Sequence, residues 1–229
     1  MTKDTQLPKQ GLTDRVYDEL RQMVMLERIG PGERLVIDRL ALRLGVSHTP
    51  LREAVARLEA EGLVKKVGST YVTAPALDPV GFLQLWEARL IVEPAAAELA
   101  ALRASDDILA EVVAALERSG LHAQDSSEDD AQQFVRTDAA FHALIVNGAD
   151  NPFLAEQLLR LHSHEHLSRL YGPAGPPSPA ATQIEHQAVV EALRARDGLA
   201  AAEAMRAHLE QARARLFSLF DPAYRYLAN

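Results

Sequence analysis

A single glycine, Gly45, separates two short stretches of helical periodicity in this sequence. Residues 37–44, before the glycine, place apolar side chains on one face of a short helix. Leu51, Val55 and Leu58, after it, follow at the spacing of a second helix with a buried inner face. Glycine adopts the backbone conformation of a tight turn at little steric cost, so two helices this short can cross steeply. The segment therefore predicts a helix-turn-helix.

The residues on either side of this motif complete a small domain. A longer helix is expected over residues 12–29, because apolar side chains recur there at helical spacing before Gly30-Pro31-Gly32 breaks the pattern. After the motif, residues 63–67 and 71–73 are β-rich and flank a hairpin tip. This order of elements predicts a winged helix-turn-helix domain over residues 1–74.

A short linker with a proline at each end, residues 75–79, separates this domain from a helical region over residues 80–229. Clusters of Gly, Pro, Ser, Asp and Asn mark the breaks between the helices of that region. The expected helices cover residues 79–103, 105–121, 127–148, 151–171, 181–196 and 198–220. The predicted fold class is therefore mostly α, with an N-terminal winged helix-turn-helix and a C-terminal all-α bundle of six or seven helices.

Charge divides between the two predicted domains, although the whole chain carries a formal net charge of −8. Residues 1–74 contain 12 Lys and Arg against 10 Asp and Glu, a net of +2. Residues 75–229 contain 12 against 22, a net of −10. The two domains therefore suit different partners, and a single N-terminal domain of net +2 would bind DNA weakly without a second copy.

Cysteine and long apolar runs are both missing from the sequence. Because there is no cysteine, disulfides and thiolate metal sites are excluded, and any metal must be held by histidine and carboxylate. No apolar run approaches the ~20 residues needed to span a bilayer, and the first residues lack the apolar core of a secretory signal. We therefore expect a cytoplasmic protein without a membrane partner.

The second helix of the motif offers the side chains expected of a DNA-reading helix. Ser47 is a suitable N-cap for it. The polar side chains on or near its outer face are His48, Thr49, Arg52, Glu53 and Arg57. The N-terminal part of such a helix enters the major groove, where arginine pairs with guanine edges or phosphates. The alternative is an ordinary helical corner with a solvated charged face, which the order of helices and hairpin disfavours.

These residues resemble the GntR family of bacterial regulators. The similarity lies in Pro31-Gly32-Glu33-Arg34-Leu35, Gly45-Val46-Ser47, Thr49-Pro50-Leu51-Arg52-Glu53-Ala54 and Leu58-Glu59-Ala60-Glu61-Gly62-Leu63-Val64. The resemblance implies DNA contacts from Arg39, from Arg52 and from the wing around Gly68. One departure is His48, because the family usually has an arginine there that reaches the DNA. A histidine is a shorter contact, so the operator sequence or affinity is expected to differ from the family norm.

The helical region carries a second group of chemically related side chains. Asp138 and His142 are four residues apart, which places them on one helical face, and His186 and His208 belong to two later helices. Three imidazoles and one carboxylate from three helices of a bundle can close on one divalent ion, with positions left for water or a ligand. The alternative is that each is a polar side chain satisfied inside the core.

This region resembles the FCD ligand-binding domain of FadR-type GntR regulators. The similarity covers residues 80–220 and rests on an Asp-x-x-Phe-His motif ending at His142, a Glu-His run ending at Asp197 and a terminal Met-x-x-His-Leu. It implies that one divalent ion (zinc, nickel or manganese) is held by Asp138, His142, His186 and His208. It also implies that a small carboxylate binds at or beside that ion.

Arg89 occupies the arginine position of the first FCD helix. Its guanidinium could meet the carboxylate of an effector with two parallel hydrogen bonds. The alternative is an ion pair with Glu93 on the same helix. A further cluster, His162-Ser163-His164-Glu165-His166, could supply a surface metal pair from His162 and His166, or form a polar stripe on an exposed helix. One of these histidines, for instance His166, could instead line the effector pocket.

Together these features predict a ligand-responsive, DNA-binding transcriptional regulator that is not an enzyme. We expect a homodimer on a pseudo-palindromic operator, because two-fold operators match dimer symmetry. The alternative is a metal-dependent hydrolytic enzyme, since a metal with an open coordination position suffices for hydrolysis. A third possibility is a winged-helix scaffold that does not bind DNA. The basic residues Arg39, Arg52, Arg57 and Lys65-Lys66 disfavour it.

Overall fold

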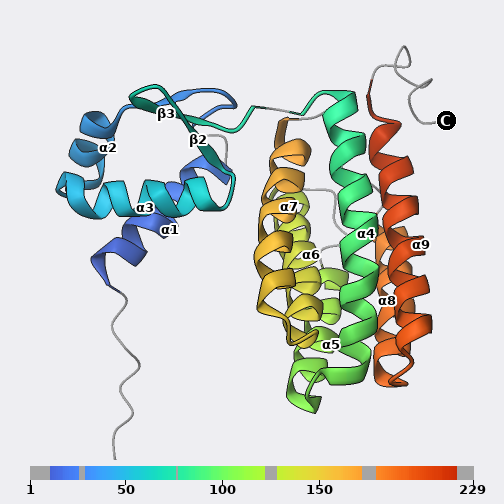
Figure 1. The fold of residues 1–229 in the computed structure, drawn as a ribbon. Coiled ribbons are helices and arrows are strands. Elements are labelled where there is room, and N and C mark those ends of the chain that lie inside the picture. The colour runs from blue at the N-terminus through green and yellow to red at the C-terminus, as the bar shows by residue number, and fades with distance from the viewer. Residues whose placement is uncertain (1–10, 26–28, 76, 122–127, 172–178, 221–229) are drawn as a thin grey trace, which may run out of the picture. The chain divides into compact units, whose positions relative to one another are not determined.

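The chain divides into two compact units, residues 1–76 and residues 77–229. The computed structural model describes residues 11–25, 29–75, 77–121, 128–171 and 179–220 (Figure 1). Each unit buries its own set of apolar side chains.

The N-terminal unit is a winged helix-turn-helix. Its described helices are α1 (Leu12–Met25), α2 (Ile37–Leu44) and α3 (His48–Ala60). Its strands are β1 (Arg34–Leu35), β2 (Val64–Val67) and β3 (Thr70–Thr73), which form an antiparallel sheet in the order β1-β3-β2. The fully buried side chains that pack α1 against α3 include Leu20, Val24, Leu51, Val55 and Leu58.

Two glycines with positive φ make the tight turns of this unit. Gly45 ends α2 at φ 65°, and Gly68 has φ 60° as the first residue of the two-residue loop between the paired residues Val67 and Thr70. Residues with a Cβ atom rarely adopt such angles, so both turns favour glycine. Ser47 occupies the predicted N-cap position of α3, although its side chain makes no capping hydrogen bond.

Two features of this unit differ from the sequence prediction. The sequence predicts a first helix that reaches residue 29, whereas Ile29 lies in a bend outside the helix and its N–H donates to the carbonyl of Met23 at 3.1 Å. The side chain of Ile29 is nevertheless buried, which explains why it continues the apolar pattern. The strand β1 is not predicted, because two residues are too few to show an alternating pattern.

The C-terminal unit is a bundle of six helices within the described residues, so the predicted mostly α fold is confirmed. They are α4 (Pro79–Arg103), α5 (Asp106–Leu121), α6 (Glu128–Gly148), α7 (Pro152–Tyr171), α8 (Pro179–Arg194) and α9 (Gly198–Phe217). Helix α4 packs against α6, α7, α8 and α9 (Figure 1). No helix in the described part of the chain is both long and apolar enough to cross a membrane.

Several predicted breaks coincide with helix N-caps. The carboxylates of Asp78 and Asp197 accept hydrogen bonds from backbone N–H groups in the first turns of α4 and α9, at 2.7 and 3.0 Å. The side chains of Ser105 and Asn151 do the same for α5 and α7. Such an acceptor satisfies an otherwise unpaired donor of the first turn and stabilises the helix by about 1 kcal/mol.

A proline inside α4 is compensated by a side chain from α9. Pro94 has no N–H, so the carbonyl of Leu90, four residues earlier, lacks its usual helical donor. Arg206 donates to that carbonyl through Nη1 at 3.4 Å. This contact ties α4 to α9 beside Glu93, a buried residue of the bundle.

Candidate functional site

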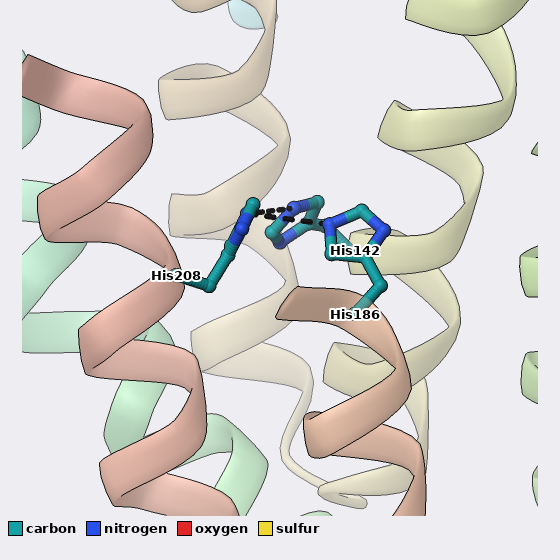
Figure 2. Close-up of side chains that lie close together, drawn as sticks. All are labelled: His142, His186 and His208. Atoms are coloured by element: carbon teal, nitrogen blue, oxygen red, sulfur yellow. Dashed lines mark hydrogen bonds between the residues drawn. The ribbon is translucent and has the colours of Figure 1, made fainter. Parts of the chain in front are cut away.

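Three imidazole rings from three different helices meet inside the C-terminal bundle. Figure 2 shows His142 of α6, His186 of α8 and His208 of α9 turned toward one another. The Nε2 atoms of His186 and His208 are 3.3 Å apart, and those of His208 and His142 are also 3.3 Å apart. The three side chains are at most 3% exposed. The bundle therefore brings three of the four predicted metal ligands together.

The fourth predicted ligand lies at the edge of this histidine cluster. Asp138 is one turn before His142 on α6 and is buried. Its Oδ1 lies 3.6 Å from Nε2 of His186. One nitrogen from each of the three histidines lies within 4.8 Å of the other two, and Asp138 is outside this group.

The spacing of these nitrogen atoms suits one metal ion. Imidazole nitrogens about 2.1 Å from a shared ion lie roughly 3.0 to 3.4 Å apart in octahedral or tetrahedral arrangements. The observed 3.3 Å separations fall within that interval. Three imidazoles and a carboxylate are also a donor set that zinc and other first-row divalent ions accept. The residues therefore fit a divalent ion with coordination positions left for a further ligand.

His142 is backed by a buried carboxylate that the sequence analysis did not identify as part of the site. Glu93 of α4 accepts a hydrogen bond from Nδ1 of His142 at 2.7 Å. Its other oxygen accepts from Nε of Arg89 at 2.5 Å and lies 3.3 Å from Nε2 of His162. Burial would raise the pKa of Glu93, but Arg89 and the two histidines outweigh it and hold that pKa well below its usual range. Glu93 is thus an ionised acceptor, and the proton of this contact lies on Nδ1 of His142.

His208 has a similar partner on its outer side. Glu185 of α8 accepts a hydrogen bond from Nδ1 of His208 at 2.9 Å. Arg215 of α9 holds the same carboxylate with two hydrogen bonds of 2.5 and 2.8 Å. Burial would raise the pKa of Glu185, but hydrogen bonds from His208 and Arg215 lower it further than burial raises it. When neutral, His208 therefore carries its proton on Nδ1 and turns the lone pair of Nε2 toward the cluster.

The same surroundings shift the pKa values of two imidazoles in opposite directions. Burial would lower the pKa of His142, but the charge of Glu93 and its hydrogen bond raise it above its usual value. Burial lowers the pKa of His208, and the neighbouring His142 lowers it further, despite the opposing effect of Glu185. The Glu93 carboxylate thus outweighs burial at His142, whereas burial prevails at His208.

Arg89, the predicted effector contact, is paired within its own helix. It is 1% exposed, it binds Glu93, and its guanidinium carbon lies 4.4 Å from the ring centroid of Trp86. The structure thus contains the ion pair that was the alternative for this residue. Contact between Arg89 and an effector stays a prediction.

His162 points into the bundle rather than along an exposed stripe. Its side chain is 11% exposed, and its ring centroid lies 5.5 Å from that of His142. Glu93, His142 and His162 are close enough to share a metal ion. The positively charged guanidinium of Arg89 is already paired with Glu93, however, and it would repel a metal cation bound to the same carboxylate. The side chains of His164 and His166 lie outside the described residues.

The residues predicted to contact DNA are all exposed in the N-terminal unit. They are Arg39 on α2, Ser47, His48, Thr49 and Arg52 at the start of α3, and Gly68 at the tip of the wing. Lys65 and Lys66 on β2 are exposed as well. This surface therefore presents basic side chains from the second and third helices and from the wing.

Arg57 does not belong to this free surface, although the helical pattern places it near the outer face of α3. Its Nη1 binds the carboxylate of Asp14 on α1 at 2.8 Å. Its guanidinium carbon also lies 3.7 Å from the ring centroid of Tyr17. Arg57 therefore braces α3 against α1.

His48 contacts an acidic side chain beside the turn. Its Nε2 lies 3.2 Å from Oδ1 of Asp38, and both side chains are more than half exposed. Together with Leu42, Gly45 and Val46 they line a shallow hollow. A phosphate or base that approaches His48 must therefore compete with Asp38 for the imidazole.

Both units match known protein families. Residues 12–71 match the model for bacterial regulatory proteins of the gntR family, and residues 84–211 match the FCD domain. The chain belongs to the GntR family. The resemblance predicted from its motifs is therefore confirmed for both domains. In this GntR regulator the FCD match includes the histidine cluster and both carboxylates behind it.

Full-length relatives agree with this assignment. The chain is 32% identical over 204 residues to an HTH-type transcriptional regulator in an unstable DNA locus of Streptomyces ambofaciens, covering 87% of this chain and 83% of that one. It is 27% identical to the HTH-type transcriptional repressor NanR of Salmonella schwarzengrund, covering 89% and 83%. The solved structure of E. coli McbR/YncC has the same fold, with a TM-score of 0.77 and 24% identity over 92% and 99% of the two chains. The protein is a DNA-binding transcriptional regulator of the ligand-responsive type.

Proposed function

We propose that this GntR regulator binds its operator as a homodimer and senses a small carboxylate at a divalent metal ion in the FCD domain. The observation that carries the proposal is the convergence of His142, His186 and His208, in which Nε2 of His208 lies 3.3 Å from Nε2 of each of the other two. Asp138 would complete the set of ligands. The bound ion would supply a Lewis-acidic centre with positions open to an anionic ligand.

The charges around the cluster support an anionic effector. Glu93 is paired with Arg89, and Glu185 is paired with Arg215, so neither pair adds net charge at the site. Three neutral imidazoles and the single carboxylate of Asp138 leave a divalent ion with a net positive charge. Such a centre attracts a carboxylate and repels a cation.

We infer that the site senses its ligand rather than transforming it. The gntR family matched by residues 12–71 consists of bacterial regulatory proteins, and the carboxylates behind the cluster are engaged by arginine and histidine donors. A carboxylate held in this way is poorly placed to act as a general base toward a bound ligand. We propose that the protein acts in the cytoplasm, where the operator DNA of such a regulator would lie.

Thermal denaturation of the zinc-loaded protein with a panel of small carboxylates tests the effector proposal. A ligand that binds only the folded state raises the thermal midpoint. We expect at least one carboxylate to raise the midpoint of the wild type and of Gln187→Ala, an exposed neighbour of the cluster, but not of His186→Ala. Equal shifts in all three proteins would contradict a metal-linked site, and the absence of any shift would contradict the effector class.

Arg52→Ala tests the DNA-reading helix. A bidentate contact from arginine to a guanine edge contributes about 1–3 kcal/mol of discrimination, so the variant should lose about that much specific binding. The measurement is fluorescence anisotropy at fixed salt, with an operator selected from genomic fragments. Arg194→Ala removes the same charge from an exposed position on α8 and should leave the affinity unchanged. An unaltered affinity in Arg52→Ala would contradict the assignment.

A further inference from the structure

Two of the three clustered histidines are contacted on their outer sides by carboxylates that are themselves held by arginines. Glu185 accepts from Nδ1 of His208, and Arg215 holds Glu185 with two hydrogen bonds. Glu93 accepts from Nδ1 of His142 in the same way, and Arg89 holds Glu93. The same arrangement of histidine, carboxylate and arginine thus occurs twice in the cluster, once at His208 and once at His142.

The proton position on an imidazole decides whether it can bind a metal. A neutral ring carries one proton, and only its unprotonated nitrogen has a lone pair to donate. The hydrogen bond made by one ring nitrogen therefore selects the nitrogen that is free for the metal. For His208 the acceptor at Nδ1 directs the lone pair to Nε2, which is the atom that faces the cluster.

We propose that Glu185 is a positioning residue that fixes the ring orientation and the Nδ1-protonated tautomer of His208, and that Glu93 does the same for His142. This inference rests on the proposed metal centre, whose ligands it prepares. The two arginines then have a different role from the carboxylates that they bind. By neutralising each carboxylate, Arg215 and Arg89 let it orient a ligand without reducing the attraction of the centre for an anion.

The surroundings of Glu185 hold its carboxylate in one position beside His208. Its side chain is 8% exposed, and that of His208 is 3% exposed. Arg215 also donates to Thr182 Oγ1 at 3.4 Å, so it is held at both Glu185 and Thr182 on α8 while it belongs to α9. The contact therefore holds α8 and α9 together at the level of the cluster.

The first test measures the tautomer of His208 in the metal-free protein. Long-range ¹H–¹⁵N spectra of ¹⁵N-histidine-labelled protein distinguish the Nδ1-protonated from the Nε2-protonated ring. We expect the Nδ1-protonated form in the wild type and in Glu191→Ala, which removes an exposed carboxylate from the same helix. Glu185→Ala should shift His208 toward the Nε2-protonated form. An unchanged tautomer in Glu185→Ala would overturn the inference, whether or not the protein binds metal.

The second test measures zinc affinity by competition with a chelator. Removing the partner of a ligating histidine typically weakens metal binding about 10- to 100-fold, and we expect a loss of that size in Glu185→Ala but not in Glu191→Ala. Arg215→Met, which keeps the carboxylate and removes its clamp, should weaken binding in the same direction and serves if Glu185→Ala folds poorly. Wild-type affinity in both variants would overturn the inference while leaving the metal centre intact. No zinc binding by the wild type would instead contradict the proposed function.

Discussion

Among single residues, His48 stands where the family resemblance leads us to expect an arginine. Arginine is always charged and reaches further than imidazole, so His48→Arg should tighten operator binding even though Asp38 lies beside this position. One added phosphate contact changes the slope of log affinity against log salt by about 0.9. Anisotropy titrations across a salt series measure both quantities. A changed operator preference at constant slope would indicate a base contact, and no change in either quantity would place the residue outside the interface.

Tyr17 supplies a prediction about stability and pH. Its hydroxyl donates to Glu61, and burial together with that carboxylate raises the pKa of Tyr17 from 10.0 to about 12. Because the folded pKa is higher than the unfolded one, this stabilisation is complete below pH 10 and is lost as the pH rises through about 12. Tyr17→Phe leaves the nearly buried Glu61 without this donor and should cost about 1–3 kcal/mol at neutral pH.

Urea denaturation followed by circular dichroism at pH 8 and pH 11 measures both effects. The difference between the wild type and Tyr17→Phe should shrink at the higher pH. Tyr71→Phe is the matched control, since no hydrogen bond of its hydroxyl is found within the described residues. Equal stability of wild type and Tyr17→Phe at pH 8 would contradict this account.

The proposed metal ligands and the carboxylates behind them differ in how far sequence alone could bring them to notice. The four proposed ligands sit in motifs with recognisable spacing, and the structure brings the three histidines among them together. Glu93 lies 49 residues from His142 and Glu185 lies 23 residues from His208, so only the packing of the helices brings each pair together. A weak signal existed, since Glu185 directly precedes His186 and Glu93 follows Arg89 by one turn.

At the scale of elements, Gly45 controls the crossing of α2 and α3. A residue with a Cβ atom at φ 65° costs roughly 1–2 kcal/mol, so Gly45→Ala should destabilise the N-terminal unit by about that amount and weaken operator binding. Gly45→Asn should do less damage, because asparagine tolerates the left-handed region better. Urea denaturation and anisotropy compare the two. Equal losses in both variants would mean that space, rather than φ, limits this position.

The helices could largely be predicted from the sequence where a polar N-cap residue or a glycine marks a helix end. Ser105, Asn151 and Asp197 mark helix starts in the sequence, and each caps a helix in the structure. Ile29 shows the limit of periodicity, because a buried apolar side chain outside a helix extends the pattern. The strand β1 owes its existence to pairing with β3, a long-range contact that two residues cannot signal.

At the scale of the whole molecule, charge predicts that two copies act together. The N-terminal residues 1–74 carry a net of only +2, so one copy binds DNA weakly and a dimer doubles the phosphate contacts. We expect sedimentation to give a homodimer and operator titrations to end at two chains per pseudo-palindromic site. A monomer that binds a single half-site with full affinity would contradict this.

The proposed metal centre joins α6, α8 and α9 through one ion bound by His142, His186 and His208. The metal content per chain tests this centre, measured by elemental analysis together with native mass spectrometry after zinc loading. We predict one ion per chain in the wild type and in Gln187→Ala, and loss of most of it in His208→Ala. Removal of the ion should also lower the thermal midpoint of the wild type, because the ion binds only the folded bundle. Full metal content in His208→Ala would contradict the assignment of the centre.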